Sequence, residues 1–237
     1  MDEGTKMKNS LAAMAVVLAS GSAYAGFQAD YIDITGVGNA IRIDNTANGG
    51  INALYAAGHF NFQYDDVGGD RGLGQFSGGT FSTFCIELQT ARDAMYEIDQ
   101  IRNAPNPTPG AVPDYDAVDE AEVAAVISAA VALEWINSDL SAGSNVTNAR
   151  LAAIQGLIWD AVLDGAVVTA NHSGVGTAMS TLSAQIGHVD NPEIFNLQAM
   201  VSADSQDQLF IVPLPTAAFA GMLTLAGLGG YKRLNRK

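Results

Sequence analysis

Cysteine is nearly missing from this sequence of 237 residues, which contains only Cys85. A single cysteine cannot form a disulfide bond within the chain, so no disulfide framework holds the fold together. The thiol is therefore free, joined to another molecule or consumed by another reaction. Basic residues are also few, with 11 lysines and arginines against 25 aspartates and glutamates and a formal net charge of -14. Such an acidic surface repels phosphate backbones, which argues against nucleic-acid binding.

The N-terminus has the three parts of a secretory signal peptide. Lys6 and Lys8 precede an apolar run over residues 11–18, and small residues follow up to Ala25. The apolar run is too short for a membrane span, and an Ala-x-Ala cleavage site follows it. We therefore expect export of the protein and cleavage after Ala25, which removes residues 1–25.

The C-terminus carries a turn motif, an apolar stretch and a basic end, in that order. They are Val212-Pro213-Leu214-Pro215, then residues 216–231, and last Lys232, Arg233, Arg236 and Lys237. The apolar stretch is slightly shorter than the about 17 to 25 residues of a membrane-spanning helix. The basic end suits the cytoplasmic side of a membrane.

This order of segments resembles the sorting tails of the PEP-CTERM family of Gram-negative surface proteins. Pro213-Leu214-Pro215 takes the place of the family's Pro-Glu-Pro. The resemblance implies an exosortase-type processing enzyme as a partner and at least transient insertion of the tail, residues 212–237, in the membrane. It also implies display at the cell surface or in the extracellular matrix of a Gram-negative bacterium.

The segment between the two ends, residues 26–211, is long enough for one domain with a sizeable core. Its first half has the pattern of antiparallel strands, because short apolar runs alternate with turns rich in Gly, Asn and Asp. The clearest runs are residues 27–34, 40–43, 59–64 and 80–88.

The second half is mainly helical in pattern. It begins after the prolines of residues 105–113, and the helical spacing predicts one helix behind the acidic residues 119–122. Further helices are predicted over about residues 145–163 and 175–186, and strands over residues 197–201 and 208–212. The predicted fold class is α+β, with an antiparallel β-sandwich or barrel-like sheet and a helical subdomain in the second half.

Two residues in this segment are chemically unusual. Cys85 lies between large apolar neighbours, and a small buried side chain on a strand is the ordinary interpretation of such a cysteine. Gln155 lies one helical turn before Trp159, which places an amide among apolar side chains. A buried amide without partners costs about 1–3 kcal/mol, so Gln155 is either bonded to a backbone group beside the sheet or functional.

Together these residues resemble the two motifs of the thioester domains of bacterial surface adhesins. The first is an aromatic-Cys-aliphatic strand motif, here Phe84-Cys85-Ile86, and the second a glutamine motif that ends in Ile-Trp, here Gln155-Gly156-Leu157-Ile158-Trp159. The family's frequent Thr-Gln-x-Ala is Ile154-Gln155-Gly156-Leu157 in this chain. The resemblance covers about residues 80–163.

In that family, the cysteine thiolate attacks the glutamine carboxamide, expels ammonia and leaves an internal thioester. The resemblance implies that Cys85 and Gln155 form the reactive pair without a cofactor, inside an apolar shield against water made by Phe84, Ile86 and Trp159. The implied partner is a surface protein or polysaccharide with an amine or hydroxyl group, which displaces the sulfur. The expected function is adhesion or matrix crosslinking by a single covalent attachment, without enzymatic turnover.

Two other functions are compatible with the sequence. A non-reactive structural component of the cell surface or extracellular matrix needs only the export and sorting signals. A secreted hydrolase needs an acid–base constellation, for which Glu87, Glu134 and Asp160 are the carboxylates to inspect. No metal is expected, because the three histidines lack metal-ligand spacing and the acidic residues 114–122 lack the pattern of an EF-hand.

Overall fold

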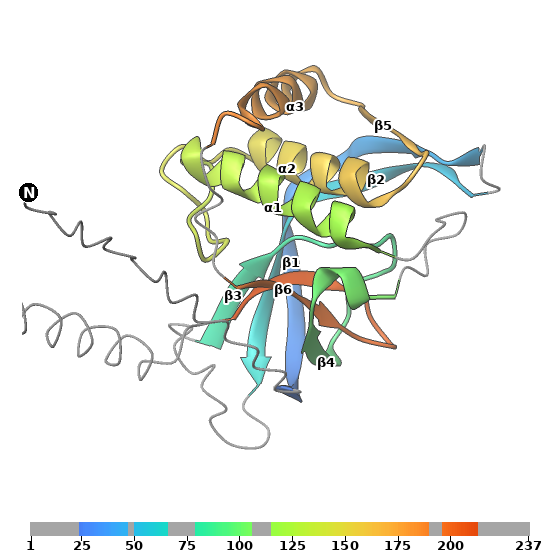
Figure 1. Ribbon diagram of the computed structural model, residues 1–237, viewed down its shortest axis with the longest axis vertical. Coiled ribbons are helices and arrows are strands. Elements are labelled where there is room, and N and C mark those ends of the chain that lie inside the picture. Colours follow the sequence, from blue (N-terminus) through green and yellow to red (C-terminus); the bar gives the residue numbers. More distant parts are fainter. Residues whose placement is uncertain (1–23, 47–49, 66–78, 106–114, 190–195, 213–237) are drawn as a thin grey trace, which may run out of the picture.

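The structure is a computed structural model that describes residues 24–46, 50–65, 79–105, 115–189 and 196–212. A long antiparallel hairpin of β1 (Tyr24–Asp44) and β2 (Asn52–Asp65) is its central element. The pairing shifts register at two places along β1, which bends the hairpin. One part of the hairpin therefore belongs to a barrel, and the other extends away from it under the helices (Figure 1).

The seven described strands form one antiparallel sheet that closes almost completely into a barrel. The hydrogen-bonded order is β3-β2-β1-β4-β6-β7, and β5 pairs with the far end of β1. The shorter strands are β3 (Thr80–Thr83), β4 (Ala94–Asp99), β5 (Val167–Ala170), β6 (Leu197–Val201) and β7 (Gln208–Ile211). An antiparallel bridge between Cys85 and Gln208 joins the chain just after β3 to β7. We call residues 83–87 and 206–209 the seam, because the two ends of the strand order meet there.

Aromatic side chains fill the interior of the barrel. Their rings contact one another at centroid distances from 5.5 to 6.2 Å. The buried members of this group are Phe27, Phe62, Phe81, Tyr96 and Phe210. Because they come from β1, β2, β3, β4 and β7, burial of their apolar surface stabilises the closed form of the sheet.

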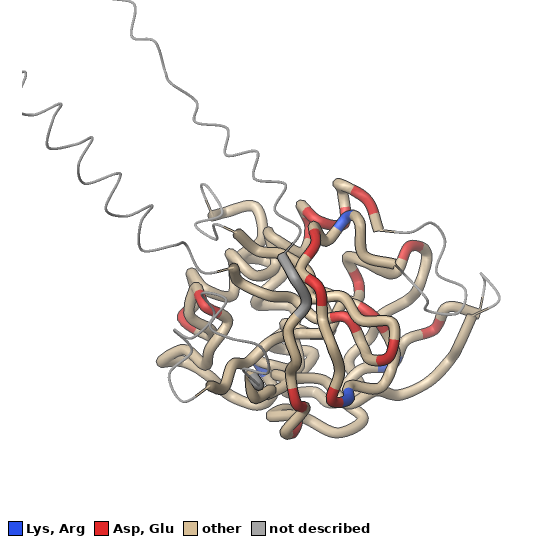
Figure 2. Tube along the Cα trace, turned by 90° about the horizontal axis from the view of Figure 1, so that it is seen from below, with Lys and Arg blue, Asp and Glu red and all other residues tan. Residues whose placement is uncertain are grey.

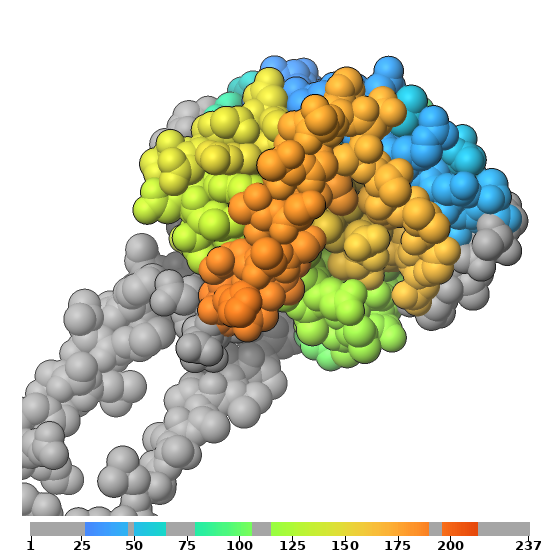
Figure 3. Space-filling model, turned by 90° about the horizontal axis from the view of Figure 1, so that it is seen from above, coloured from blue at the N-terminus to red at the C-terminus, as the bar shows by residue number. Residues whose placement is uncertain are grey.

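In the part of the chain that the structure describes, three helices cover one side of the sheet: α1 (Ala117–Ala132), α2 (Asn148–Val162) and α3 (Ser173–Gln185). Asp116 begins α1 with a capping box, and the Thr147 side chain caps α2. α2 contacts β1, β2, α1 and α3, whereas α3 crosses the outer face of the molecule (Figure 3). The central position of α2 explains why every residue from 151 to 159 is buried.

The structure confirms the α+β class and the helical second half, and the sheet has the barrel-like form. The predicted strands over residues 27–34 and 40–43 are parts of the single strand β1. The predicted strand over residues 80–88 is shorter, because regular pairing ends at Thr83. β4 and β5 were not predicted, since both are short and expose alternate residues.

Charged residues are distributed over the described trace with acids in large excess (Figure 2). Among the residues with described positions, Arg102 and Glu120 form the one salt bridge, with a distance of 2.9 Å. The domain surface is therefore acidic and mostly free of ion pairs.

Several sequence predictions lie wholly or partly outside the described residues. The signal peptide up to residue 23 and the tail from Pro213 onward, with Leu214, Pro215 and the basic end, belong to this group. The expected cleavage site after Ala25 falls at the start of β1, which begins at Tyr24. Within the described ranges, none of the helices has the length and apolar character needed to cross a membrane.

Gly36 and Gly58 lie opposite each other in the β1–β2 pair. A Cβ atom at Gly36 would lie 2.0 Å from the Ala57 carbonyl oxygen and 2.7 Å from the Gly58 Cα atom. Since both are main-chain atoms, the strands would have to separate. We predict that Gly36→Ala lowers the free energy of unfolding in urea by about 3 kcal/mol or more. Gly38→Ala is the control, because nothing lies within 4 Å of its added Cβ; similar losses in both variants would contradict the prediction.

Candidate functional site

Cys85 lies in the seam with its side chain fully buried. Its bridge to Gln208 is flanked by two backbone hydrogen bonds, Ile86 N–H to the Asp207 carbonyl (3.0 Å) and Leu209 N–H to the Phe84 carbonyl (2.7 Å). In an antiparallel pair of this kind the two central residues do not bond each other, and their Cα atoms lie about 4.5 Å apart. The side chains of Cys85 and Gln208 therefore project side by side from the same face of the sheet.

Gln155 bonds the main chain of Cys85 from the other edge of the strand. The Cys85 N–H donates to Gln155 Oε1 at 2.9 Å, and Gln155 Nε2 donates to the Cys85 carbonyl at 2.8 Å. Both main-chain groups point away from β7, so the side-chain amide occupies the place that a further strand would take. The structure thus brings the two residues singled out in the sequence into direct contact.

Gln208 is a second glutamine beside Cys85, which the sequence analysis did not select. Its side chain is fully buried, and its Nε2 donates to the backbone carbonyl and the Oε1 atom of Gln206, both at 3.2 Å. Its own Oε1 has no hydrogen-bond partner among the described residues. A buried carbonyl oxygen without a donor is uncommon and calls for an explanation. In the sequence, Gln208 could have been recognised as a polar residue at the first position of an otherwise apolar strand.

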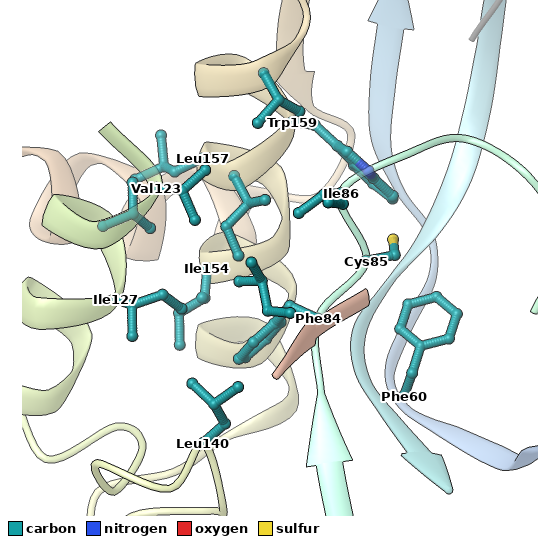
Figure 4. Packing of buried hydrophobic residues seen from close by; sticks show 14 of the residues in the cluster. Phe60, Phe84, Cys85, Ile86, Val123, Ile127, Leu140, Ile154, Leu157 and Trp159 are labelled. Carbon is teal, nitrogen blue, oxygen red and sulfur yellow. The ribbon is translucent and has the colours of Figure 1, made fainter. Parts of the chain in front are cut away.

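The three residues expected to shield Cys85 lie on different sides of it (Figure 4). Phe84 and Ile86 point toward the helices, whereas the sulfur points to the opposite side of the strand. Trp159 lies close enough to the sulfur to affect its ionisation, but its indole N–H makes no hydrogen bond of normal geometry with any described group. The contact of Trp159 with the sulfur is therefore a weak electrostatic one.

The surroundings of Cys85 favour the neutral thiol. Burial raises the pKa of the thiol well above its ordinary value, and the Glu87 charge raises it further. The Trp159 side chain and the backbone of Cys85 act in the opposite direction but do not compensate. Because only the thiolate is a strong nucleophile, reaction at Cys85 requires a group that accepts its proton.

Two carboxyl groups are buried next to Cys85. Glu87 and Asp207 are 1% and 0% exposed, and the Asp207 N–H donates to Glu87 Oε1 at 2.8 Å. Asp207 accepts the Ser202 N–H at one oxygen, and its other oxygen has no partner among the described groups. Burial, and secondly the charge of Asp207, raises the pKa of Glu87 to about 8, and burial raises the pKa of Asp207 to about 7. The pair therefore retains a proton near neutral pH.

The other carboxylates considered from the sequence do not join this site. Glu134 accepts a hydrogen bond from the Ser144 hydroxyl in an exposed turn, at 2.6 Å. Asp160 is exposed and borders a pocket of about 220 Å³ between the three helices, together with Glu122 and Ser183. No cluster of three potential metal ligands occurs within the ranges that the structure describes.

Comparison with known proteins gives no further assignment. A scan of protein-family models, a search of curated proteins and a search of solved structures each find no significant match to this chain. The resemblance to thioester domains therefore depends on the two sequence motifs alone.

Loss of the Gln155 amide should destabilise the protein. Gln155→Met keeps a side chain of similar length but leaves the N–H and C=O of Cys85 buried without partners, at about 1–3 kcal/mol for each group. We predict a decrease of about 2–6 kcal/mol in the free energy of unfolding, measured by urea denaturation. Gln63→Met, at an exposed position of β2, is the control and should change stability by less than about 0.5 kcal/mol.

The buried carboxyl pair should make stability fall as the pH rises. Both carboxyl groups hold protons in the folded state at pH values where the unfolded chain has released them. Their contribution to stability is therefore complete below their ordinary pKa values and decreases as the pH rises to about 8. The lowered pKa of buried His59 acts in the opposite direction, but only below its ordinary value of 6.5. Between about pH 6.5 and 8.5 we predict a decrease of about 2 kcal/mol in the free energy of unfolding in urea. The decrease should be smaller in Asp207→Asn, which removes one of the two groups and part of the pKa shift of Glu87. A flat wild-type profile would contradict this.

Proposed function

We propose that this protein attaches covalently to partner molecules through an internal thioester, formed between Cys85 and a buried glutamine side chain. The observation that carries the proposal is that the single cysteine lies fully buried between the side chains of Gln155 and Gln208. Two carboxamides beside one sheltered thiol are the reactants that thioester formation needs. No cofactor takes part.

The geometry favours Gln208 as the acyl partner. The Gln155 carboxamide lies along the strand edge with both polar atoms bonded to the Cys85 backbone, whereas the sulfur projects from the face of the sheet. The Gln208 side chain projects from that same face, and its carbonyl oxygen has no donor among the described residues. In this arrangement Gln155 holds Cys85 in place. Gln155 as the acyl partner, as the sequence motifs predict, is the alternative.

The chemistry proceeds in two steps. The Cys85 sulfur bonds to the glutamine Cδ atom, the C–N bond breaks and ammonia leaves. An amine or hydroxyl group on a surface protein or polysaccharide later bonds to the same carbon, and the sulfur departs as a thiol. Complete burial of Cys85 protects the thioester from water before that encounter.

The expected signals at the two ends suit this function. Export, processing by an exosortase-type enzyme and display at the surface or matrix of a Gram-negative bacterium would bring the domain to molecules that carry such nucleophiles. Each molecule reacts once, so the protein acts as an adhesin or crosslinker and not as an enzyme. The tail would contact the membrane only transiently, while the protein is sorted.

The proposal predicts a mass change. The purified domain, residues 26–211, should have an intact mass short by one ammonia, and methylamine should convert this form to the methylamide adduct. Cys85→Ala should have its full calculated mass and no adduct. A wild-type domain with full mass and a titratable thiol after unfolding would instead indicate a non-reactive structural component.

Peptide mapping of the methylamine adduct identifies the acyl partner. We expect the methylamide on Gln208, and a Gln208→Glu variant should have neither the ammonia deficit nor the adduct. A methylamide on Gln155 would assign the bond to the pair predicted from the sequence. A modification on neither glutamine would contradict the proposed chemistry.

A further inference from the structure

The carboxyl pair of Glu87 and Asp207 interrupts the seam in an unusual way. In a regular ladder the Asp207 N–H would donate to the Ile86 carbonyl, but it donates to Glu87 Oε1 instead. The Ile86 carbonyl accepts the hydroxyl of Tyr115 in its place. A glutamine oxygen would accept the Asp207 N–H equally well and would avoid burial of an ionisable group. The structure therefore contains an acid where a neutral side chain would satisfy the fold.

No opposite charge compensates the pair among the described residues, where neither carboxyl group forms a salt bridge. The groups that face it are acidic or neutral on every side. They are the Cys85 thiol in the seam, the Tyr115 hydroxyl before α1 and the Tyr96 hydroxyl from β4. On α2, the neutral side chains of Gln155 and Trp159 lie at Cys85. Glu87 is also the one charged group in this surrounding that acts on the Cys85 thiol.

We propose that Glu87 exchanges protons with the reacting groups at Cys85 and that Asp207 is its positioning residue. This inference rests on the thioester proposed above. The Asp207 N–H holds the Glu87 carboxyl group in the seam, next to the Cys85–Gln208 bridge, and the Tyr115 hydroxyl bonds the Ile86 carbonyl between Cys85 and Glu87 in the chain. The polar side chain of Gln206 adds a further bond to the Glu87 carbonyl, at 2.6 Å.

The proton balance is complete without a cofactor. During formation of the thioester, the Glu87 carboxylate takes the proton of the Cys85 thiol and returns it to the departing nitrogen, which leaves as ammonia. During attachment, Glu87 takes a proton from the attacking amine and passes it to the Cys85 sulfur as the C–S bond breaks. Glu87 ends each step in its initial form. Its pKa of about 8 suits transfer in both directions near neutral pH.

The test is the pH dependence of thioester cleavage by hydroxylamine, whose nitrogen is mostly uncharged above about pH 7. The domain is treated with hydroxylamine, and the rate of adduct formation is measured by intact mass. We expect the wild-type rate to rise with pH and level off near pH 8. Asp207→Asn should shift this inflection to lower pH, because it removes a charge that disfavours the Glu87 carboxylate. Glu87→Gln should react about 100-fold more slowly and without the inflection.

Asp160→Asn is the control, because this carboxyl group lies on the exposed side of α2, and its profile should equal that of the wild type. An Asp207→Asn profile equal to the wild type, or an inflection retained in Glu87→Gln, overturns the role of Glu87. If circular dichroism shows that Glu87→Gln does not fold, the shift of the inflection in Asp207→Asn is the deciding result. A wild-type ammonia deficit with no inflection removes this inference only, whereas the absence of the deficit removes the thioester and this inference together.

Discussion

The pair of hydrogen bonds between the Gln155 side chain and the Cys85 main chain joins the helical layer to the seam of the barrel. Beyond Thr83 the strand has β7 on one side and no strand on the other, so its N–H and C=O groups would otherwise be buried without partners. Because α2 supplies the missing partner, these main-chain groups are satisfied only when the helix, the chain after β3 and β7 are all in place. The site is therefore complete only where the barrel is closed.

The same region holds a high density of buried polar groups. Glu87, Gln155, Gln206, Asp207 and Gln208 are all at most 3% exposed, in a domain whose remaining core is mainly apolar. Such groups reduce stability unless they are fully bonded, and two of their oxygen atoms have no donor among the described residues. Departures of this kind from an apolar core concentrate at functional sites, which is consistent with reactivity at the seam.

Part of the fold and of the site was predictable from local patterns. The three helices follow from apolar spacing and capping residues, and the strand-like runs of the first half identify most of the sheet. β4 and β5 escaped prediction because a short strand with alternate exposure, such as residues 94–99, resembles a polar loop in sequence. Gln155 was recognisable because an amide within an apolar helix must find a partner.

The sequence alone determined the residue types and their local settings: one thiol in an apolar strand, one amide in a buried helix and an acidic chain with few bases. Only the tertiary structure decided that Gln208 lies opposite Cys85 and that Glu87 and Asp207 share a buried position. These contacts join segments far apart in the chain, and a shift of one residue in strand register would turn each side chain to the other face. Register in turn depends on closure of the barrel, which no local pattern encodes.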